Sequence, residues 1–278
     1  MTAAPLLSDL RGVSLRSGQI ALAWLGQASF ALRVGDSLML VDPFLSPHPG
    51  RLFPPPFGPE EAAGVDAVLC THEHLDHFDA DAVRSIAQAS PASRVVVPRP
   101  LVSRVTDLGI APDRVIGVQP GEPVELGGVS IHPVPAMHGV EVADAYTFGQ
   151  ELAGGLYAFV GYVIEAGGVR AYHAGDTIPY DGMEGWLRPL TVDVALLPIN
   201  GRNAEREAQN LVGNLDHEEA AGLAAAIACD VLVPMHYDMF AANLGYPDRL
   251  VEVVIRDRLD LAITIPARGR PWIYTKAR

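Results

Sequence analysis

Short apolar runs rich in β-branched residues recur along nearly the whole of this 278-residue chain. Most of them are bounded by Gly, Pro, Asp or Asn, which is typical of strands separated by turns. Two further segments, 79–89 and 217–228, carry apolar residues at helical spacing. The chain is therefore predicted to be an α/β or α+β protein, with strands at residues 20–25, 29–34, 37–41, 66–70, 94–97, 129–134, 158–164, 169–173, 193–197, 231–233 and 261–265.

A chain of this length forms either one large domain or two small ones, and its 49% hydrophobic residues suffice for a core in both cases. A Pro-rich stretch at 43–59 and a stretch with Gly and aromatic residues at 139–155 interrupt the strands. Strands resume on both sides of each stretch with no change of composition, which argues against a domain linker. We expect a single domain over residues 1–278 with both stretches as loops over a site, because long loops in compact domains are often functional.

Lys and Arg total 20 against 33 Asp and Glu, a formal net charge of −13 at pH 7. Such a surface repels polyanions, and no run of Lys or Arg supplies a basic patch. Neither binding to long nucleic acid nor stable membrane association is therefore expected. A small anionic substrate is compatible with this negative charge, because bound divalent cations can reverse the charge inside a site. The composition is also compatible with a homo-oligomer.

No apolar stretch approaches the roughly 20 residues that cross a bilayer, and the first 19 residues lack the pattern of a signal peptide. We therefore expect a soluble, cytoplasmic protein. The two cysteines, Cys70 and Cys229, have no pairing motif and no metal-type spacing. They are predicted to be reduced thiols in the core.

The strongest functional signal is a group of metal-binding residue types directly after the predicted strand 66–70. His72, His74, Asp76 and His77 fall within six residues. Three of the nine histidines gathered beside an aspartate favour a metal site over a chance group of surface side chains. Imidazole and carboxylate donors suit zinc, manganese or iron, and the lack of a thiolate cluster argues against a structural zinc site. The zinc-protease pattern H-E-x-x-H fails, because Asp76 stands where the second histidine is required.

Three further donors follow the ends of later predicted strands: His138, Asp176 and His236. Sites with two metal ions need nitrogen and oxygen donors from several strand ends. Taken singly, His138 or His236 could be an ordinary core or surface histidine. As members of an ordered set that already has four candidates, they are predicted to be ligands.

This ordered set, H-x-H-x-D-H followed by His, Asp and His, resembles the pattern of the metallo-β-lactamase superfamily, and the likeness runs from Trp24 to beyond Asn243. The resemblance implies an α+β fold, an αββα sandwich of two mixed β-sheets flanked by helices, with the site at one edge. It also implies two divalent metal ions, Zn²⁺ or Mn²⁺. By the same resemblance, the first ion has the ligands His72, His74 and His138, the second has Asp76, His77 and His236, and Asp176 bridges them.

Several segments are similar to the subgroup of the L-ascorbate-6-phosphate lactonases, which is close to the group of N-acylphosphatidylethanolamine phospholipase D. These segments are 24–30, 41–43, 172–177, 192–202 and 234–240. The resemblance implies hydrolysis of a small lactone or related ester, with a phosphorylated sugar lactone as one candidate. The alternative is a phosphodiesterase that acts on small phosphodiesters derived from cyclic nucleotides, RNA or phospholipids.

The predicted chemistry is hydrolysis by a metal-activated water. Two divalent ions that share a water lower its pKa from about 15.7 toward about 7, which gives a bridging hydroxide at neutral pH. Asp76 is the predicted catalytic residue, because besides ligation it could orient this water and carry its proton to the leaving group. An iron enzyme that handles thiols or oxygen without hydrolysis is a different class with the same donors. A sensor with a vestigial site is disfavoured by the complete donor set.

Two residues are candidates for supporting the ligands. Asp42 could hydrogen-bond the distal nitrogen of a ligand histidine, or it could simply start a turn before Pro43. His173 is either a proton shuttle or, as we favour, a strand histidine whose ring binds a backbone carbonyl.

Three residues are candidates for binding substrate: Arg202, Asn203 and Tyr237. The arginine could clamp a phosphate or carboxylate, and the tyrosine hydroxyl could donate to an oxyanion. The alternative for Arg202 is an ion pair with a surface acid. Asn214 or Asp216 is expected to cap the next helix, with His217 in its first turn.

Overall fold

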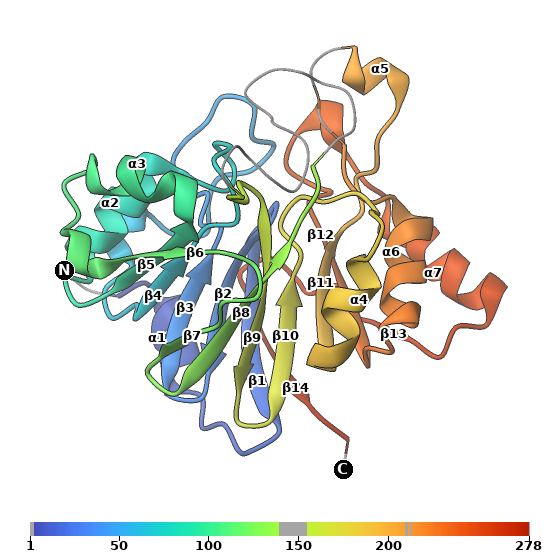
Figure 1. Cartoon of the computed structure of the whole chain (residues 1–278), viewed down its shortest axis with the longest axis horizontal. Coiled ribbons are helices and arrows are strands. Elements are labelled where there is room, and N and C mark those ends of the chain that lie inside the picture. The colour runs from blue at the N-terminus through green and yellow to red at the C-terminus, as the bar shows by residue number, and fades with distance from the viewer. Residues whose placement is uncertain (1–2, 139–154, 209–210, 212, 278) are drawn as a thin grey trace.

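The computed structural model describes residues 3–138, 155–208, 211 and 213–277 (Figure 1). The loop predicted at 139–155 lies outside the described residues except for Gly155. In chain order, the α-helices and strands are α1 (Pro5–Gly12), β1 (Gln19–Gly26), β2 (Ser29–Val34), β3 (Ser37–Val41), β4 (Ala67–Leu69), α2 (Ala80–Ala89), β5 (Arg94–Pro98), α3 (Val102–Thr106), β6 (Val115–Val118), β7 (Val124–Leu126), β8 (Val129–Pro135), β9 (Val160–Ala166), β10 (Val169–His173), α4 (Met183–Leu187), β11 (Val194–Pro198), α5 (Ala204–Glu207), α6 (His217–Ala226), β12 (Val231–Met235), α7 (Pro247–Asp257), β13 (Ala262–Ile263) and β14 (Pro271–Thr275).

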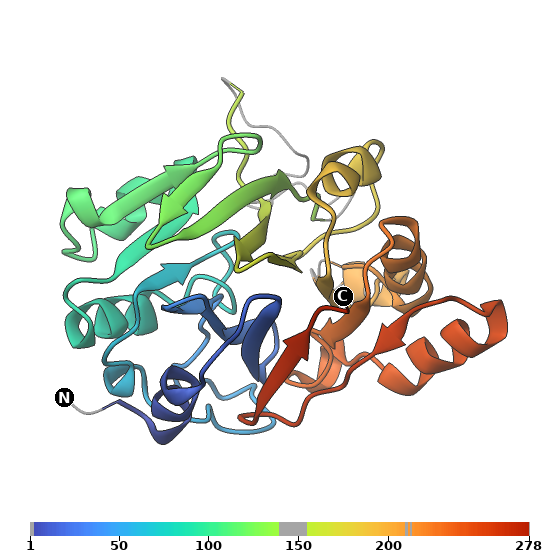
Figure 2. The ribbon, with the colours of Figure 1, turned by 90° about the horizontal axis from the view of Figure 1, so that it is seen from below.

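The strands form two seven-stranded mixed sheets. The first has the order β14-β1-β2-β3-β4-β5-β6 and the second the order β13-β12-β11-β10-β9-β8-β7. Each sheet contains three consecutive antiparallel pairs and three consecutive parallel pairs. Helices cover the outer faces: the teal helix α2 and the orange helices α6 and α7 lie at opposite sides of the molecule in both views (Figures 1 and 2). The predicted α+β sandwich of two mixed sheets is confirmed.

Alternate residues of the first sheet face two different cores. In β1, Ile20 and Leu22 belong to the core between the two sheets, whereas Ala21 and Ala23 belong to the core beneath the outer helices. All four side chains are fully buried. A strand directs successive side chains to opposite faces, so a strand covered on both faces has an almost continuous apolar sequence. Full burial of one leucine side chain contributes about 1.5–3 kcal/mol to the free energy of folding. Apolar runs that are buried on both faces are therefore the strongest strand signals in the sequence.

The two predicted helices are present, and both begin with an aspartate cap. Asp79 accepts a hydrogen bond from the backbone of Ala82 at the start of α2. Asp216 accepts from two backbone N–H groups at the start of α6, and Glu219 accepts in return from the backbone N–H of Asp216. Of the two caps proposed for α6, the structure therefore uses Asp216, and His217 is the first helical residue as predicted. No helix of the described residues is long and apolar enough to span a membrane.

Several elements lack a clear sequence signal. The helices α1 and α7 and the strands β6, β7 and β14 were not predicted. The 11-residue helix α7 buries only Leu250 and Val253, so its apolar stripe is narrow. The strand β14 comes from the C-terminal end of the chain and pairs antiparallel with β1. Its residues suit a strand, but its place in the first sheet depends on that long-range pairing.

Four strands place the candidate ligands at one edge of the sandwich. The strands β4, β8, β10 and β12 end at Leu69, Pro135, His173 and Met235. Each is followed within three residues by the first candidate donor of its loop, which explains why residues far apart in sequence meet here.

Candidate metal centre

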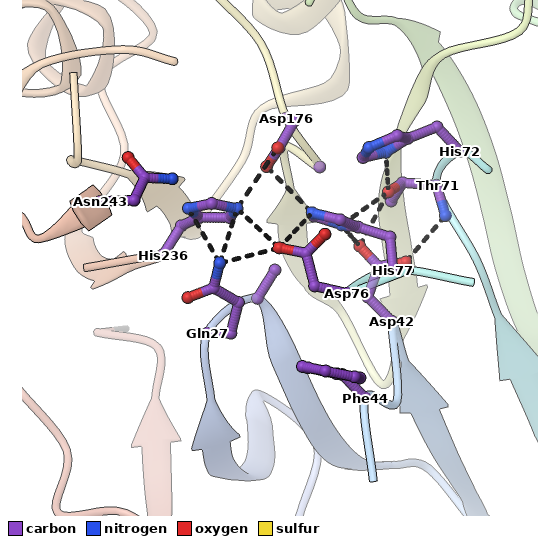
Figure 3. Close-up of polar contacts among 12 residues, drawn as sticks. Gln27, Asp42, Phe44, Thr71, His72, Asp76, His77, Asp176, His236 and Asn243 are labelled. Atoms are coloured by element: carbon purple, nitrogen blue, oxygen red, sulfur yellow. Dashed lines mark hydrogen bonds and ion pairs between the residues drawn. The ribbon is translucent and has the colours of Figure 1, made fainter. Parts of the chain in front are cut away.

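The structure brings all seven predicted donors together. They form two groups, and in each group one donor atom per residue lies within 4.8 Å of the others. The first group is His72, His74, His138 and Asp176, and the second is Asp76, His77 and His236. Figure 3 shows the carboxylates of Asp76 and Asp176 among these imidazole rings.

Asp176 joins the two groups. Its Oδ2 lies 3.4 Å from Nε2 of His138 in the first group and 3.3 Å from Nε2 of His236 in the second. Its Oδ1 lies 3.2 Å from Nε2 of His77. The Asp176 carboxylate therefore lies between the two groups and contacts donors of both, which is the position of a bridging ligand.

The backbone around the donors adopts conformations that are costly for side-chain-bearing residues. His236, Asp42 and Gln27 have φ values of +59°, +45° and +54°. Asp176 follows Gly175, whose φ is +61° and whose position would bring a Cβ within 2.8 Å of the side chain of Thr71. Strained residues of this kind persist only where the surroundings hold them, and they gather at functional sites.

Asp42 and Thr71 set the orientation of two imidazole rings. Nδ1 of His77 donates to Asp42 at 2.7 Å. The Thr71 hydroxyl also donates to Asp42, at 2.8 Å, so its oxygen is left to accept from Nδ1 of His72 at 3.0 Å. With Nδ1 of both rings occupied in this way, Nε2 of His72 and Nε2 of His77 are the nitrogens that face the cluster, as a metal ligand needs. Burial opposes a charge on His77, but Asp176, Asp76 and Asp42 raise its pKa, so a bound cation would displace the proton from its Nε2.

His173 does not take part in the cluster. Its Nε2 donates to the backbone oxygen of Ala28 at 2.7 Å, and its Nδ1 accepts from the backbone N–H of Gly175 at 3.2 Å. The ring is fully buried, and this burial lowers its pKa. Both nitrogens are therefore occupied by the backbone, which supports the structural interpretation of His173 over the proton shuttle.

Gln27 is a site residue that the sequence analysis missed. Its Nε2 lies 2.8 Å from Oδ2 of Asp76 and 3.0 Å from Nε2 of His236 (Figure 3). Its backbone oxygen accepts from the backbone N–H of His236 at 2.9 Å. Gln27 thus ties the turn between β1 and β2 to the second donor group. The only signal was its place in the segment 24–30, because an amide by itself indicates no chemistry.

Burial and charge fix the protonation of the donors. Burial lowers the pKa of His74 to about 3 and that of His138 to about 4, so both rings are neutral at physiological pH. Burial opposes the charge on His236 too, but Asp176 and Asp76 raise its pKa to about 9. Burial alone would raise the pKa of Asp76, yet His77 and His236 hold it well below its usual range. The carboxylates are thus ionised and ready to act as ligands.

The donor set fits a divalent cation. Nε2 of His72 is buried and has no hydrogen-bond partner in the described part of the chain. A buried polar atom left in this way costs about 1–3 kcal/mol, which coordination of a cation would offset. Imidazole nitrogens and carboxylate oxygens at this spacing are donors that zinc and manganese accept.

A cavity of about 310 Å³ opens above the cluster. Its lining contains no Lys or Arg among the described residues, and most of its wall is apolar. Phe44 comes from the Pro-rich loop at 43–59, so this loop borders the site as predicted. The lining residues are Phe44, His74, Leu75, Asp76, His138, Asp176, Leu211, His236, Phe240, Ala242 and Asn243.

The three predicted substrate contacts do not line this cavity. Arg202 forms a two-pronged ion pair with Glu219 at 2.6 Å, which is the alternative considered for it and leaves the predicted phosphate clamp unsupported. Asn203 caps α5 by accepting a hydrogen bond from its backbone. Tyr237 stacks on Trp24 with ring centroids 4.9 Å apart. All three side chains therefore have structural partners, whereas Asn243, which was not predicted, lies on the cavity wall.

Known proteins are similar to this chain in sequence and in fold. A UPF0173 metal-dependent hydrolase from Aeropyrum pernix is 33% identical over 276 residues, covering 92% of this chain and 99% of the relative. Igni18, a metallo hydrolase from Ignicoccus hospitalis, matches with a TM-score of 0.71 at 24% identity over 93% of this chain and 100% of its own. An isothiocyanate hydrolase from Delia radicum gut bacteria matches with a TM-score of 0.71 at 20% identity over 92% of this chain and 100% of its own.

The family described as the beta-lactamase superfamily domain matches residues 38–237. This matched segment contains all seven clustered donors. The chain thus belongs to the metallo-β-lactamase superfamily and is a metal-dependent hydrolase.

Proposed function

We propose that this protein hydrolyses a small, uncharged lactone or related ester at a site that holds two divalent cations, zinc or manganese. The observation that carries the proposal is the apolar cavity wall directly above the two groups of metal donors. His72, His74 and His138 would hold one cation, Asp76, His77 and His236 the other, and Asp176 would contact both.

Asp76 is the proposed catalytic residue. Bound cations would supply Lewis acidity and lower the pKa of a water molecule. The Asp76 carboxylate lines the cavity and is held by Gln27 at 2.8 Å. From this position it can orient the attacking water and carry its proton to the leaving oxygen of the opened ring. The Gln27 amide also lies within hydrogen-bond distance of His236, so it fixes the position of the Asp76 carboxylate relative to this histidine.

The cavity wall favours an uncharged substrate over a phosphorylated one. Phe44, Leu75 and Phe240 supply apolar surface, and the described lining contains no Lys or Arg. The segment 139–154, which follows His138 in the sequence, also contains no Lys or Arg. A phosphate group that lies against this wall, away from the proposed cations, would lose its hydration without a Lys or Arg to compensate. A neutral ring with an apolar substituent would instead gain from burial against the aromatic side chains.

A small phosphodiester is the second candidate. Two cations in one site also stabilise the attacking and leaving oxygens of phosphoryl transfer. The two donor groups joined by Asp176 are the observation that keeps this candidate. The apolar wall does not support a second recognition site for the charged groups of a nucleotide or phospholipid head.

A substrate panel with measured metal content tests the proposal. We expect two zinc or manganese ions per chain, and the highest kcat/KM on a lactone with an alkyl substituent. Lower values are expected on a sugar lactone, a sugar-phosphate lactone, bis-p-nitrophenyl phosphate and an alkyl isothiocyanate. Preferred turnover of the phosphodiester would replace the proposal by its second candidate. Stoichiometric iron with redox activity, or turnover by metal-free protein, would refute it.

Two variants connect this activity to the cluster. Asp176→Ala and His74→Ala are expected to lose most bound metal and all measurable turnover while keeping the circular dichroism of the wild type, because the two sheets carry the fold. His132→Ala is the matched control, since this histidine lies on β8 outside both donor groups. Full activity of Asp176→Ala would contradict the assigned site.

A further inference from the structure

Three asparagines form a hydrogen-bonded line that ends at the cavity wall. Nδ2 of Asn214 donates to Oδ1 of Asn200 at 3.1 Å. Nδ2 of Asn200 donates in turn to Oδ1 of Asn243 at 2.9 Å. Asn214 is fully buried, Asn200 is 5% exposed, and Asn243 lines the cavity. None of the three is a candidate metal ligand.

The direction of this line decides which atom of Asn243 faces the substrate. A primary amide has its acceptor oxygen and its donor nitrogen on opposite sides. Because Asn200 occupies the oxygen of Asn243, the amide nitrogen of Asn243 is left to donate. Figure 3 shows this nitrogen on the side toward His236. Within the described part of the chain, it has no acceptor of its own.

The opposite direction of the line is less favourable. Oδ1 of Asn214 is buried and has no hydrogen-bond partner among the described residues. If all three amides were turned round, Asn214 would instead bury its NH₂ group with both donors unpaired. An unpaired buried N–H is rarer in proteins than an under-satisfied carbonyl. The far end of the line therefore favours the direction that directs an N–H donor into the cavity.

Backbone contacts hold the line against the cluster. The guanidinium of Arg206 donates to the backbone oxygen of Asn200 and, at 2.9 Å, to that of Leu244. The backbone N–H of Gly245 donates to the oxygen of Tyr237 at 2.9 Å. The loop that carries Asn243 is therefore fixed on one side to Asn200 and on the other to the residue after His236.

We infer that Asn243 donates a hydrogen bond to the carbonyl oxygen of the substrate and to the oxyanion that forms from it, with Asn200 and Asn214 as positioning residues. This inference rests on the proposed function and names how the same site recognises its substrate. The donor is uncharged, as suits a neutral ester in a cavity that already holds Asp76 and Asp176. A donor aimed at developing negative charge acts mainly on kcat, because its bond strengthens in the transition state.

The kinetic test uses variants that keep the shape of the side chain. Asn243→Asp replaces the donor by an oxygen, and we expect a loss in kcat of about 10²–10³-fold with unchanged metal content. In Asn200→Asp, the new carboxylate can only accept hydrogen bonds, so the Asn243 amide is expected to turn its nitrogen toward residue 200. This variant should lower kcat although residue 200 does not contact the substrate. Asn243→Gln keeps a donor and should recover part of the rate. Gln88→Glu introduces the same charge at an exposed position of α2, away from the site, and should stay within about twofold of the wild type.

A second measurement does not depend on turnover. In the metal-free protein, the side-chain ¹⁵NH₂ resonance of Asn243 is assigned by its loss in Asn243→Asp. Addition of δ-valerolactam, an unreactive carbonyl analogue of a lactone, is expected to shift this resonance in the wild type but not in Asn200→Asp.

The two measurements separate the two proposals. Wild-type protein that hydrolyses nothing in the panel but shows the lactam-induced shift would refute the proposed function and retain Asn243 as a carbonyl donor. An Asn243→Asp enzyme with kcat within twofold of the wild type, or a resonance that does not move, would overturn the inference about Asn243.

Discussion

The ring orientation of single histidines depends on one buried carboxylate. Asp42 accepts from His77 at 2.7 Å, and from the hydroxyl and the backbone N–H of Thr71 at 2.8 Å each. Through Thr71 it also influences His72. A group that fixes ligand tautomers in this way raises the affinity of the ligands without touching the metal.

We therefore expect Asp42→Asn to weaken metal binding by about 10–100-fold, because the amide can no longer accept from both His77 and Thr71 as a charged group. Competition with a chelator of known affinity measures this. Asp193→Asn is the matched control, since Asp193 is also a buried carboxylate that accepts a backbone hydrogen bond, from Arg170 at 2.8 Å, but lies before β11 at the opposite end of the strand. Equal loss of affinity in both variants would show a general effect of buried charge.

The two cysteines are free and buried, as predicted from the sequence. Burial raises the pKa of Cys229 to about 12 and that of Cys70 well above its usual value. Only the thiolate reacts with iodoacetamide, so neither residue should be alkylated in the folded protein at pH 8.5. The unfolded chain releases these protons near pH 9 and the folded chain does not, so this contribution to stability is present below pH 9 and is lost as the pH rises toward 12.

Mass spectrometry after labelling with and without urea checks this prediction. The added thiol of Ser8→Cys, at an exposed position of α1, should label without urea and serves as the positive control. Rapid native labelling of Cys70 or Cys229 would show that the core opens more readily than the structure indicates.

At the scale of elements, the N-terminal cap of α6 lies next to the line of asparagines that leads to the cavity. Asp216 accepts at 2.9 Å from the backbone N–H groups of Glu218 and Glu219. Glu219 also pairs with Arg202. Because Asn214 lies two residues before this cap, the first turn of α6 sets where the line of asparagines begins.

Asp216→Ala removes both cap hydrogen bonds and is expected to lower the free energy of unfolding by about 1 kcal/mol. Urea unfolding followed by circular dichroism measures the change. Asp260→Ala, at an exposed loop position, should stay within about 0.5 kcal/mol of the wild type. If both variants lost the same stability, the cap would contribute nothing beyond a surface charge.

At the scale of the whole molecule, the two sheets and their cores enclose the donors without needing a cation to hold them together. We expect metal-free protein to keep the far-ultraviolet circular dichroism of the loaded form. Restored zinc at about 100 times its Kd should raise the stability by about 2.7 kcal/mol, because the ion binds the folded state. Thermal unfolding with and without chelator tests this, and Asp176→Ala should show little response to zinc. A collapse of secondary structure on chelation would mean that metal binding drives folding.

The sequence alone determined the features that depend on neighbouring residues. Strand and helix positions follow from the spacing of apolar side chains, and α2 shows this, since Ala82, Val83 and Ile86 form one buried face. The histidine cluster was visible because four donors lie within six residues after one strand. The later donors could be assigned only as an ordered set, since the residue type of His138 or His236 alone carries no such information.

Only the tertiary structure decided which distant side chains meet. Arg202 pairs with Glu219, Gln27 supports Asp76 across 49 residues, and Asn200 contacts Asn243 across 43 residues. An amide or a guanidinium has no periodic signature, and its role depends on which groups the packed sheets bring to it. Local spacing therefore specifies the elements and the metal donors, whereas substrate contacts depend on loop positions that exist only after the sheets have packed.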